Sequence, residues 1–256
     1  MKKLLAFDLD GTLLGDGDIS PFTLEVLERY RRAGYMIAVA TGRNKQYAQR
    51  ILDIVKPHGA SIADGACAYV GDTLINQIFI PQSDTVQIIN KLKKYHHIAG
   101  VVMNTQGGYF QSVPFPQGVT FHPDLVNATT VVPLEDFVHH QAYDFLLQST
   151  DGDVWADIVK DFPGLYIMTY ETFSIIRPQH SDKWYALALV AEALGIEPKD
   201  IIAFGDNDND LKMLENSGVS VAMGNATDNA KKAADHICGT NEADGVAHWL
   251  LEAFPL

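Results

Sequence analysis

The chain has 256 residues, of which 47% are hydrophobic and 20% charged. This length and composition are typical of a soluble globular protein with one large domain or two modest ones. A formal net charge of −13 argues against a broad nucleic-acid-binding surface, which needs clustered Lys and Arg. An anionic substrate stays compatible with this charge, because a metal ion and a few placed cations reverse the local field.

Neither a membrane span nor a leader segment is expected. The apolar run of residues 4–7 is cut short by Asp8 and Asp10, and no stretch approaches the ~20 apolar residues of a transmembrane helix. The two cysteines, Cys67 and Cys238, form no CxxC pair and are expected to pack in the interior. We therefore expect a cytoplasmic protein without membrane or nucleic-acid partners.

Three short apolar runs, residues 4–7, 36–40 and 201–204, each lead into a polar cluster. Each run is too short for a helix and is apolar on both faces, which is typical of a central strand in a parallel sheet. Helices are predicted between them, over residues 21–33, 44–55, 183–194 and 208–216, with Ser20-Pro21 as a start signal and Gly34 and Gly195 as end signals. The alternation predicts an α/β fold with a Rossmann-like, doubly wound parallel-sheet core.

The middle of the chain has a different pattern. An amphipathic helix is predicted over residues 84–95, with Val86, Ile89 and Leu92 on its apolar face. Strand-like segments follow at 100–103 and 109–113, and a hairpin is predicted from 166–170 and 173–176. We therefore predict that residues 1–81 and 183–256 form the core and that residues 82–182 form an inserted α+β domain.

Asp8 and Asp10 stand two residues apart, directly after the first apolar run. Like charges so close repel each other, and partial burial adds a desolvation cost. A bound cation relieves both penalties, and a phosphoryl-transfer centre uses such a pair as nucleophile and proton shuttle. The alternative is a turn in which Asp and Gly only shape the backbone, and the pair alone does not decide between the two.

The clusters after the other strands are expected at the same edge of the sheet, where ligands of doubly wound folds bind. Thr41 suits phosphate oxygens, Arg43 suits a phosphate or the leaving group, and Lys183 suits the charge of a transition state. Taken singly, Thr41-Gly42-Arg43 also fits a helix cap with a surface arginine, and Lys183 also fits an exposed lysine. The presence of all the parts in order favours a site.

Asp206 adds a third carboxylate for a hard cation, for which Mg²⁺ is the best fit. Asn209 and Asp210 follow on the turn into the next helix and suit the support of metal ligands or waters. Residues 206–210 also resemble a calcium loop, but Leu211 stands where that loop needs glycine.

Competing motifs are absent from the sequence. There is no nucleotide-binding P-loop, no dinucleotide fingerprint and no G-x-S-x-G nucleophile elbow. The adjacent pairs His96-His97 and His139-His140 are expected to be surface or structural residues, because neighbouring side chains point in different directions.

The order of the motifs resembles the haloacid dehalogenase superfamily of phosphatases. Residues 8–14 (Asp-Leu-Asp-Gly-Thr-Leu-Leu) match its first motif, residues 41–43 its second, Lys183 its third and residues 205–210 its fourth. Segments 218–226 and 244–247 resemble the Cof-like branch, which carries a type IIB cap between the second and third motifs. The resemblance implies that the inserted domain is a cap that determines substrate specificity.

The resemblance also implies Mg²⁺-dependent hydrolysis of a small phosphorylated metabolite, such as a sugar phosphate. Asp8 would attack phosphorus and form an aspartyl phosphate, while Asp10 would protonate the leaving oxygen and then deprotonate the attacking water. The metal would be held by Asp8, the backbone carbonyl of Asp10, and Asp206, and Asp210 would support the site from outside this ligand set. The implied phosphate- and substrate-binding residues are Thr12, Thr41, Gly42, Arg43, Lys183 and Asn209.

Asp64 departs from the family pattern, in which Asn usually stands before Gly-Ala. One interpretation is that the charge of Asp64 narrows the substrate range. The other is that Asp64 only shapes a turn. Candidate cap contacts to substrate are Tyr109, Phe110, His122 and Tyr170, although packing is the favoured explanation for each of them.

Two alternatives to a phosphatase are carried forward. One is a phosphomutase acting on a sugar phosphate, which would keep water away from the aspartyl intermediate. The other is a non-catalytic regulator that binds a phosphorylated metabolite. We expect a monomer or a homodimer.

Overall fold

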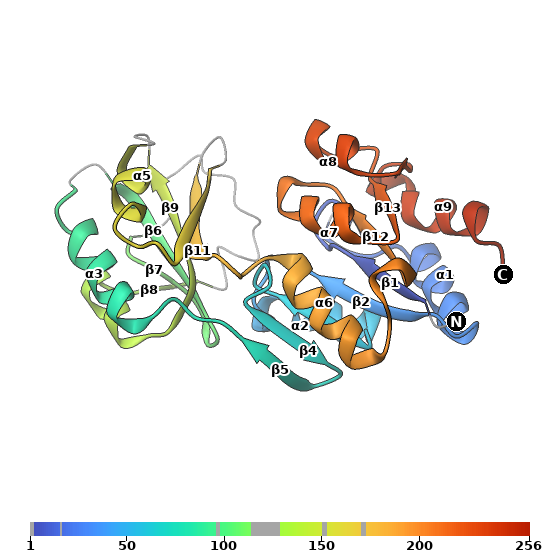
Figure 1. Ribbon diagram of the computed structural model, residues 1–256, viewed down its shortest axis with the longest axis horizontal. Helices are drawn as coiled ribbons and strands as arrows, with labels where there is room; N and C mark the ends of the chain where they lie inside the picture. The colour runs from blue at the N-terminus through green and yellow to red at the C-terminus, as the bar shows by residue number, and fades with distance from the viewer. Residues whose placement is uncertain (1–2, 16, 96–97, 114–128, 150–152, 170–172) are drawn as a thin grey trace. The chain divides into compact units, whose positions relative to one another are not determined.

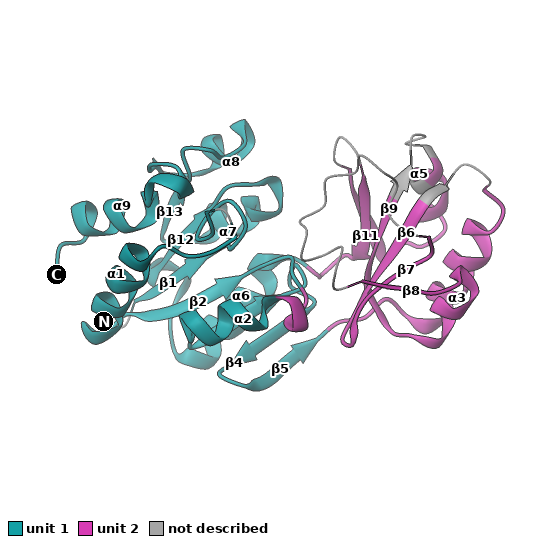
Figure 2. Ribbon diagram, turned by 180° about the vertical axis from the view of Figure 1, so that it is seen from behind, with its two compact units in different colours: residues 1–43, 48–77, 182–256 teal, residues 44–47, 78–181 magenta. Residues whose placement is uncertain are grey.

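The computed structural model describes residues 3–15, 17–95, 98–113, 129–149, 153–169 and 173–256 (Figure 1). The described chain forms two compact units, each built on its own sheet (Figure 2). Unit 1 comprises residues 1–43, 48–77 and 182–256, and unit 2 comprises residues 44–47 and 78–181. The chain therefore passes into unit 2 after Gln77 and returns to unit 1 at Asp182, whereas the predicted limits of the insert are residues 82 and 182.

The sheet of unit 1 has eight strands in the order β14-β13-β12-β1-β2-β3-β4-β5. The strands are β1 (Leu4–Phe7), β2 (Met36–Ala40), β3 (Gly59–Ile62), β4 (Cys67–Val70), β5 (Thr73–Gln77), β12 (Ile201–Gly205), β13 (Val219–Ala222) and β14 (His236–Ile237). Strands β14 to β3 pair in parallel, and β4 and β5 extend the sheet with antiparallel pairs. The three strands predicted from the apolar runs lie next to one another as β12, β1 and β2, which confirms the predicted α/β core.

Helices cover both faces of this sheet. Because side chains alternate in direction along each strand, successive residues of β1 pack against helices on opposite faces. Leu5 and Phe7 pack in one cluster with α1 (Pro21–Arg32), α2 (Lys45–Val55) and α9 (Gly245–Ala253). Leu4 and Ala6 pack in another with α6 (Lys183–Leu194). The remaining elements are α7 (Leu211–Asn216), α8 (Asp228–Ala233) and the 3-10 turns η2 (Pro198–Asp200), η3 (Asp208–Asp210) and η4 (Asn241–Ala243). Burial on both faces explains why the strand sequence is apolar throughout.

Two predicted helix signals are confirmed. Ser20 precedes α1, and its hydroxyl oxygen accepts a hydrogen bond from the N–H of Thr23 at 3.0 Å, with Pro21 in the first helical position. Gly195 follows α6 with φ +71°, the left-handed conformation that ends many helices.

The sequence predicted one helix over residues 208–216, but this segment is not one continuous α-helix. It begins as the 3-10 turn η3 and becomes α-helical at Leu211. The carboxylate of Asp210 accounts for the difference, because it accepts hydrogen bonds from the N–H groups of Asp206 (3.0 Å) and Asn207 (3.1 Å). These bonds draw the turn back onto the end of β12.

Unit 2 contains a six-stranded sheet in the order β10-β11-β9-β6-β7-β8. The strands are β6 (Ile98–Thr105), β7 (Gly108–Gln111), β8 (Thr129–Val131), β9 (Ala142–Ser149), β10 (Leu165–Thr169) and β11 (Ser174–Pro178). Helices α3 (Gln82–Leu92) and α5 (Asp153–Val159) and the 3-10 helix η1 (Leu134–His139) pack on one face, around Met103, Phe145 and Ile176. Unit 2 therefore has the predicted α+β character, and on its other sheet face Tyr109 contacts Asn44 and Tyr47 at the start of α2.

Details within unit 2 differ from expectation. The predicted helix 84–95 begins two residues earlier and ends at Leu92, and Val86 is exposed whereas Ile88 is buried. The predicted hairpin is present as β10 and β11, although residues 170–172 lie outside the described part of the chain. Phe110 stacks on His140 with ring centres 4.1 Å apart and so packs within the unit. His96, His97, His122 and Tyr170 also lie outside the described residues.

Across the described ranges, no helix has both the length and the apolar character that a membrane crossing requires. Both cysteines are free, Cys67 is buried, and burial raises the pKa of the Cys238 thiol to about 11. A raised pKa keeps the thiol protonated and unreactive, in keeping with the expected packing role.

Candidate active site

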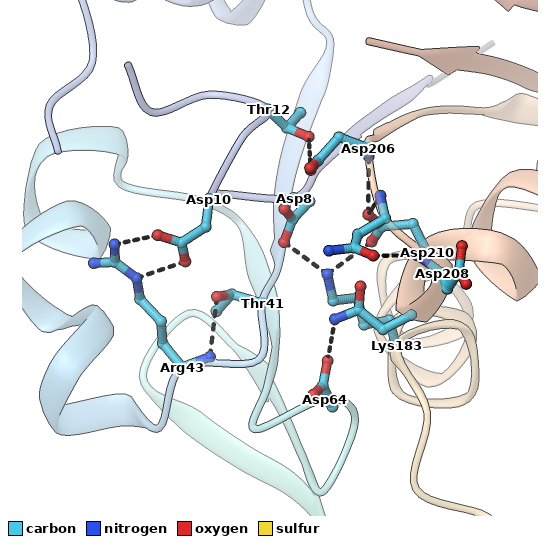
Figure 3. Close-up of polar contacts among 12 residues, drawn as sticks. Asp8, Asp10, Thr12, Thr41, Arg43, Asp64, Lys183, Asp206, Asp208 and Asp210 are labelled. Carbon is cyan, nitrogen blue, oxygen red and sulfur yellow. Dashed lines mark hydrogen bonds and ion pairs between the residues drawn. The ribbon is translucent and has the colours of Figure 1, made fainter. Parts of the chain in front are cut away.

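The carboxyl ends of β1, β2 and β12 lie side by side and carry Asp8, Thr41 and Asp206 (Figure 3). The N–H of Asp8 donates to the carbonyl of Phe204 at 3.0 Å, so the sheet continues one residue beyond β1. The N–H of Thr41 donates in the same way to the carbonyl of Ser61 at 2.9 Å. The backbone thus fixes where both side chains begin, and parallel topology brings distant parts of the sequence to one edge.

Lys183 reaches the same edge from the first turn of α6. The helix starts at Asp182, whose carboxylate accepts a hydrogen bond from the N–H of Tyr185 at 2.7 Å. The Lys183 ammonium donates to Asp8 Oδ1 and to Asp210 Oδ1, both at 2.7 Å. Lys183, Asp8 and Asp210 are only 2%, 4% and 0% exposed, so the alternative of an exposed lysine is wrong.

Burial and charge act against each other in this group. Burial raises the pKa of Asp8 well above its usual range, the Lys183 ammonium lowers it, and the charges of Asp210 and Asp206 raise it again. Burial alone would lower the pKa of Lys183, but the carboxylates of Asp210, Asp8 and Asp64 raise it well above its usual value. Lys183 therefore stays protonated, while Asp8 needs further positive charge to stay ionised.

A metal ion held by three carboxylates would supply the positive charge that Asp8 needs. One oxygen each from Asp8, Asp206 and Asp210 lies within 4.8 Å of the others. Burial, followed by the charge of Asp210, also raises the pKa of Asp206. Three acids around one lysine leave surplus negative charge, and an all-oxygen donor set suits a hard divalent cation. The donor set therefore fits a divalent metal.

Asp210 is the most firmly held of the three acids. One of its oxygens accepts from Lys183 and the other from the N–H groups of Asp206 and Asn207. The family resemblance implies that Asp210 lies outside the metal ligand set and that the backbone carbonyl of Asp10 is the third ligand. The hydrogen bonds show what Asp210 does in this structure, which is to orient Lys183 and the turn that carries Asp206.

Asp10 points away from this group. Figure 3 shows its side chain directed toward Arg43, not toward Asp8. Arg43 binds both carboxylate oxygens of Asp10, with Nε at 2.8 Å and Nη2 at 2.5 Å. The Asp10 side chain is 49% exposed, whereas Arg43 is only 5% exposed. The predicted role of Arg43 is to hold substrate, but here its planar fork orients the predicted acid-base residue.

The remaining predicted phosphate-binding residues line the same edge. The hydroxyl of Thr12 donates to Asp206 Oδ1 at 2.9 Å, so Thr12 orients a candidate metal ligand. The hydroxyl oxygen of Thr41 accepts from the N–H of Arg43 at 3.1 Å and leaves its own proton for another acceptor. A Cβ at Gly42 would lie 3.1 Å from Asp64 Oδ2, so this glycine allows the loop after β3 to come close.

Asp64 contacts predicted site residues from that loop. It is 7% exposed with φ +48°, and its Oδ1 accepts a hydrogen bond from Asn209 Nδ2 at 2.8 Å. The next residue, Gly65, has φ +90°, and a Cβ there would lie 1.8 Å from the carbonyl oxygen of Asp182. Asp64 therefore shapes a tight turn and its charge also raises the pKa of Lys183, whereas an effect on the substrate range stays a prediction.

Gly11 and Asn225 belong to the predicted motifs but not to the predicted site residues. Gly11 has φ +83°, and a Cβ there would lie 2.4 Å from Asp206 Oδ2, so only glycine lets this carboxylate approach. Asn225 Nδ2 donates to the carbonyl of Gly11 at 2.8 Å. The Gly after the paired aspartates is a sequence signal for the first residue, and the signal for Asn225 is its place in the segment 218–226 that resembles the Cof-like branch.

The comparisons with known proteins agree with this geometry. The family model for haloacid dehalogenase-like hydrolases matches residues 5–250. The 5-amino-6-(5-phospho-D-ribitylamino)uracil phosphatase YitU of Bacillus subtilis (strain 168) is 30% identical, over 99% of this chain and 98% of that protein. The pyridoxal phosphate phosphatase YbhA of Escherichia coli (strain K12) is 29% identical, over 97% of each chain.

A solved structure extends the similarity to the fold. The sugar phosphatase BT4131, of subclass IIB of the haloacid dehalogenase superfamily, superposes with a TM-score of 0.85 over 98% of each chain at 23% identity. The superposition includes residues of both units, so the sheet of unit 2 belongs to the shared fold. The chain is a member of the haloacid dehalogenase-like hydrolase family with the fold of subclass IIB.

Proposed function

We propose that the protein is a Mg²⁺-dependent phosphatase that hydrolyses a small phosphomonoester, such as a sugar phosphate, through an aspartyl phosphate on Asp8. The observation that carries this proposal is the buried group of Asp8, Lys183, Asp206 and Asp210 at the carboxyl edge of the sheet. It combines a nucleophile, a fixed cation and a metal-binding donor set in one place.

The class of reaction follows from the relatives. Two proteins that align with nearly the whole chain are named phosphatases, one for a phosphorylated ribitylamino-uracil and one for pyridoxal phosphate. The chain is therefore a phosphoric monoester hydrolase. Which phosphomonoester it hydrolyses, and with which metal, belongs to our proposal.

In the first half of the reaction a carboxylate oxygen of Asp8 attacks phosphorus, and the bond from phosphorus to the leaving oxygen breaks. Asp10 donates a proton to that oxygen as it leaves. The ammonium of Lys183 and the hydroxyl of Thr41 hold the transferring oxygens. When bound, Mg²⁺ supplies positive charge that keeps Asp8 ionised and offsets the negative charge of the phosphoryl group.

In the second half the carboxylate of Asp10 takes a proton from water, and the water oxygen attacks the phosphorus of the aspartyl phosphate. The bond between Asp8 and phosphorus breaks, and phosphate leaves. Asp10 must therefore change protonation twice, and its two hydrogen bonds from Arg43 set the orientation from which its carboxylate starts. We assign residues 82–182 the role of a cap that keeps water away during the first half.

Phosphate release from a panel of phosphomonoesters, measured with and without Mg²⁺, tests the proposal. We expect Asp8→Asn to lower turnover by at least about 10³-fold, since the amide is not a nucleophile. Asp208→Asn is the matched control, because Asp208 contacts Thr227 and Asn229 and lies outside the proposed machinery. Equal turnover by wild type and Asp8→Asn contradicts the proposal, and isomer formation without phosphate release supports the phosphomutase instead.

A further inference from the structure

The turn that carries Asp10 is tied to a distant part of the chain. This turn comprises residues 9–12 and is closed by a hydrogen bond of 3.2 Å from its last N–H to its first carbonyl. The carbonyl of Gly11 bonds outside the turn and accepts from Asn225 Nδ2 at 2.8 Å. Asn225 follows β13 and lies 214 positions further along the chain. All of these residues belong to unit 1, so the tie lies within one compact unit.

A second asparagine fixes the first. The N–H of Asn241, the first residue of η4, donates to Asn225 Oδ1 at 3.1 Å. This bond identifies the oxygen of the Asn225 amide and so directs Nδ2 toward Gly11. Asn241 Nδ2 in turn donates to the carbonyl of Leu14 at 2.6 Å. The two asparagines therefore bind both ends of the segment from Gly11 to Leu14.

The turn needs this tie because its third residue is glycine. A Cβ at Gly11 would overlap Asp206 Oδ2, so only glycine lets that carboxylate approach. Glycine adopts many backbone conformations, and φ +83° is only one of them. A hydrogen bond to its carbonyl selects one orientation of the peptide that joins Gly11 to Thr12.

Two groups that the proposed reaction uses flank this peptide (Figure 3). Before it comes Asp10, the proposed acid and base, whose carboxylate binds Arg43 Nε and Nη2. After it comes Thr12, whose hydroxyl donates to Asp206 Oδ1 at 2.9 Å. Arg43 thus orients the end of the Asp10 side chain, whereas Asn225 orients the backbone from which that side chain starts.

We propose that Asn225 is a positioning residue for the proton transfers of Asp10 and that Asn241 supports it. Oδ1 and Nδ2 of Asn225 both bind backbone groups, so Asn225 acts through the turn and not by contact with the reacting atoms. Because rates depend steeply on the placement of a catalytic group, a small displacement of Asp10 is enough to slow the reaction. This inference rests on the proposed phosphatase activity and gives the loop after β13 a part in it.

The test compares an ester whose leaving group needs a proton with one whose leaving group does not. An alkoxide must be protonated as it leaves, whereas p-nitrophenolate is stable without a proton. We expect Asn225→Ala to lower kcat/KM about three- to tenfold for the alkyl phosphate that wild type hydrolyses fastest, the range of one hydrogen bond. For p-nitrophenyl phosphate the loss should stay below about twofold, since kcat/KM covers only the steps up to release of the phenolate.

A binding measurement separates placement of Asp10 from contact with the phosphate. The inhibition constant of inorganic phosphate should be the same for Asn225→Ala and wild type, because Asn225 does not hold the phosphoryl group. A raised inhibition constant would show that Asn225 binds the ligand and would overturn the positioning role.

Asn216→Ala is the matched control, because Asn216 Nδ2 also donates to a backbone carbonyl, that of Lys212 at 2.7 Å, in an exposed bond. It should leave both kcat/KM values as in wild type, and it should melt at about the same temperature as Asn225→Ala. Equal losses for the two esters in Asn225→Ala, or no loss for either, would overturn the inference while the proposed function stands. If wild type releases phosphate from no ester, the proposed function is wrong and the inference falls with it.

Discussion

The two sheets of the molecule carry their polar groups in different places. In unit 1 charged side chains gather at the ends of parallel strands, and the buried charges of Asp8, Lys183 and Asp210 each have an opposite charge beside them. In unit 2 the polar side chains stand on the strands themselves, are mostly uncharged, and include unmet acceptors. Reaction chemistry thus depends on a charge-compensated cluster that parallel strands bring together, whereas the polar groups of unit 2 depend on the register of single strands.

The largest expected effect comes from removing the charge compensation in unit 1. Lys183→Met leaves Asp8 and Asp210 buried without the ammonium that both contact, and we expect a loss of about 3–5 kcal/mol in the free energy of unfolding. Urea denaturation in EDTA measures it. Mg²⁺ should restore more stability to Lys183→Met than to wild type, because the variant has the larger surplus of negative charge.

Lys212→Met is the control for that experiment. Lys212 donates to Asp182 at 2.8 Å, but its side chain is 58% exposed, so its loss should cost less than about 1 kcal/mol. Similar losses for the two variants would mean that the buried cluster is not held together by charge, and the contrast between the two sheets would then fail.

An intermediate effect is expected at Arg43, and it concerns catalysis more than stability. Arg43→Met frees the carboxylate of Asp10 from its two hydrogen bonds, and misplacement of a catalytic group by about 1 Å costs on the order of 10²-fold in kcat. Arg43→Lys should recover little of this, because an ammonium does not bind a carboxylate through a planar fork. Steady-state kinetics that show a raised KM with unchanged kcat would instead support the predicted substrate contact.

The smallest expected effect lies away from both polar regions. Burial, followed by the charge of Arg31, lowers the pKa of His58, whose Nδ1 accepts a hydrogen bond from the N–H of Ile37 at 3.0 Å. The unfolded chain binds this proton more readily, so the stability that His58 contributes is complete above about pH 6.5 and is lost as pH falls through the lowered pKa. His58→Gln should therefore flatten the fall in melting temperature between pH 7.5 and 5.

His139→Gln, an exposed histidine of unit 2, provides the comparison for this titration. It should leave the pH dependence of the melting temperature as in wild type. A steeper acid loss in His58→Gln would show that protonated His58 stabilises the fold, contrary to the lowered pKa.

The central strands were predictable because burial on both faces leaves a run of apolar residues, as in Leu4–Phe7 and Met36–Ala40. The meeting of Asp8, Thr41 and Asp206 was predictable too, since parallel strands share their carboxyl edge. The pairing of Arg43 with Asp10 was not, because it depends on side-chain directions that no local pattern specifies.

The register of the unit 2 strands shows a second limit of prediction from sequence. Alternation along β6 indicates that Asn104 and Val102 share a face, but not which residues of β7 and β9 lie opposite them. That register depends on irregular pairing in β6, where it shifts between Asn104 and Thr105. Similarly, the helical period predicted Val86 on the apolar face of this helix, but Val86 is exposed and Ile88 is buried.

The capping residue of α6 has a consequence for the position of Lys183. The Asp182 carboxylate accepts hydrogen bonds from the N–H of Tyr185 and from the Lys212 ammonium. Its backbone lies so close to Gly65 that a Cβ at that position would clash with it. The chain that re-enters unit 1 is thus clamped one residue before Lys183. Because these contacts fix the start of α6, they also fix the position from which the Lys183 ammonium reaches Asp8 and Asp210.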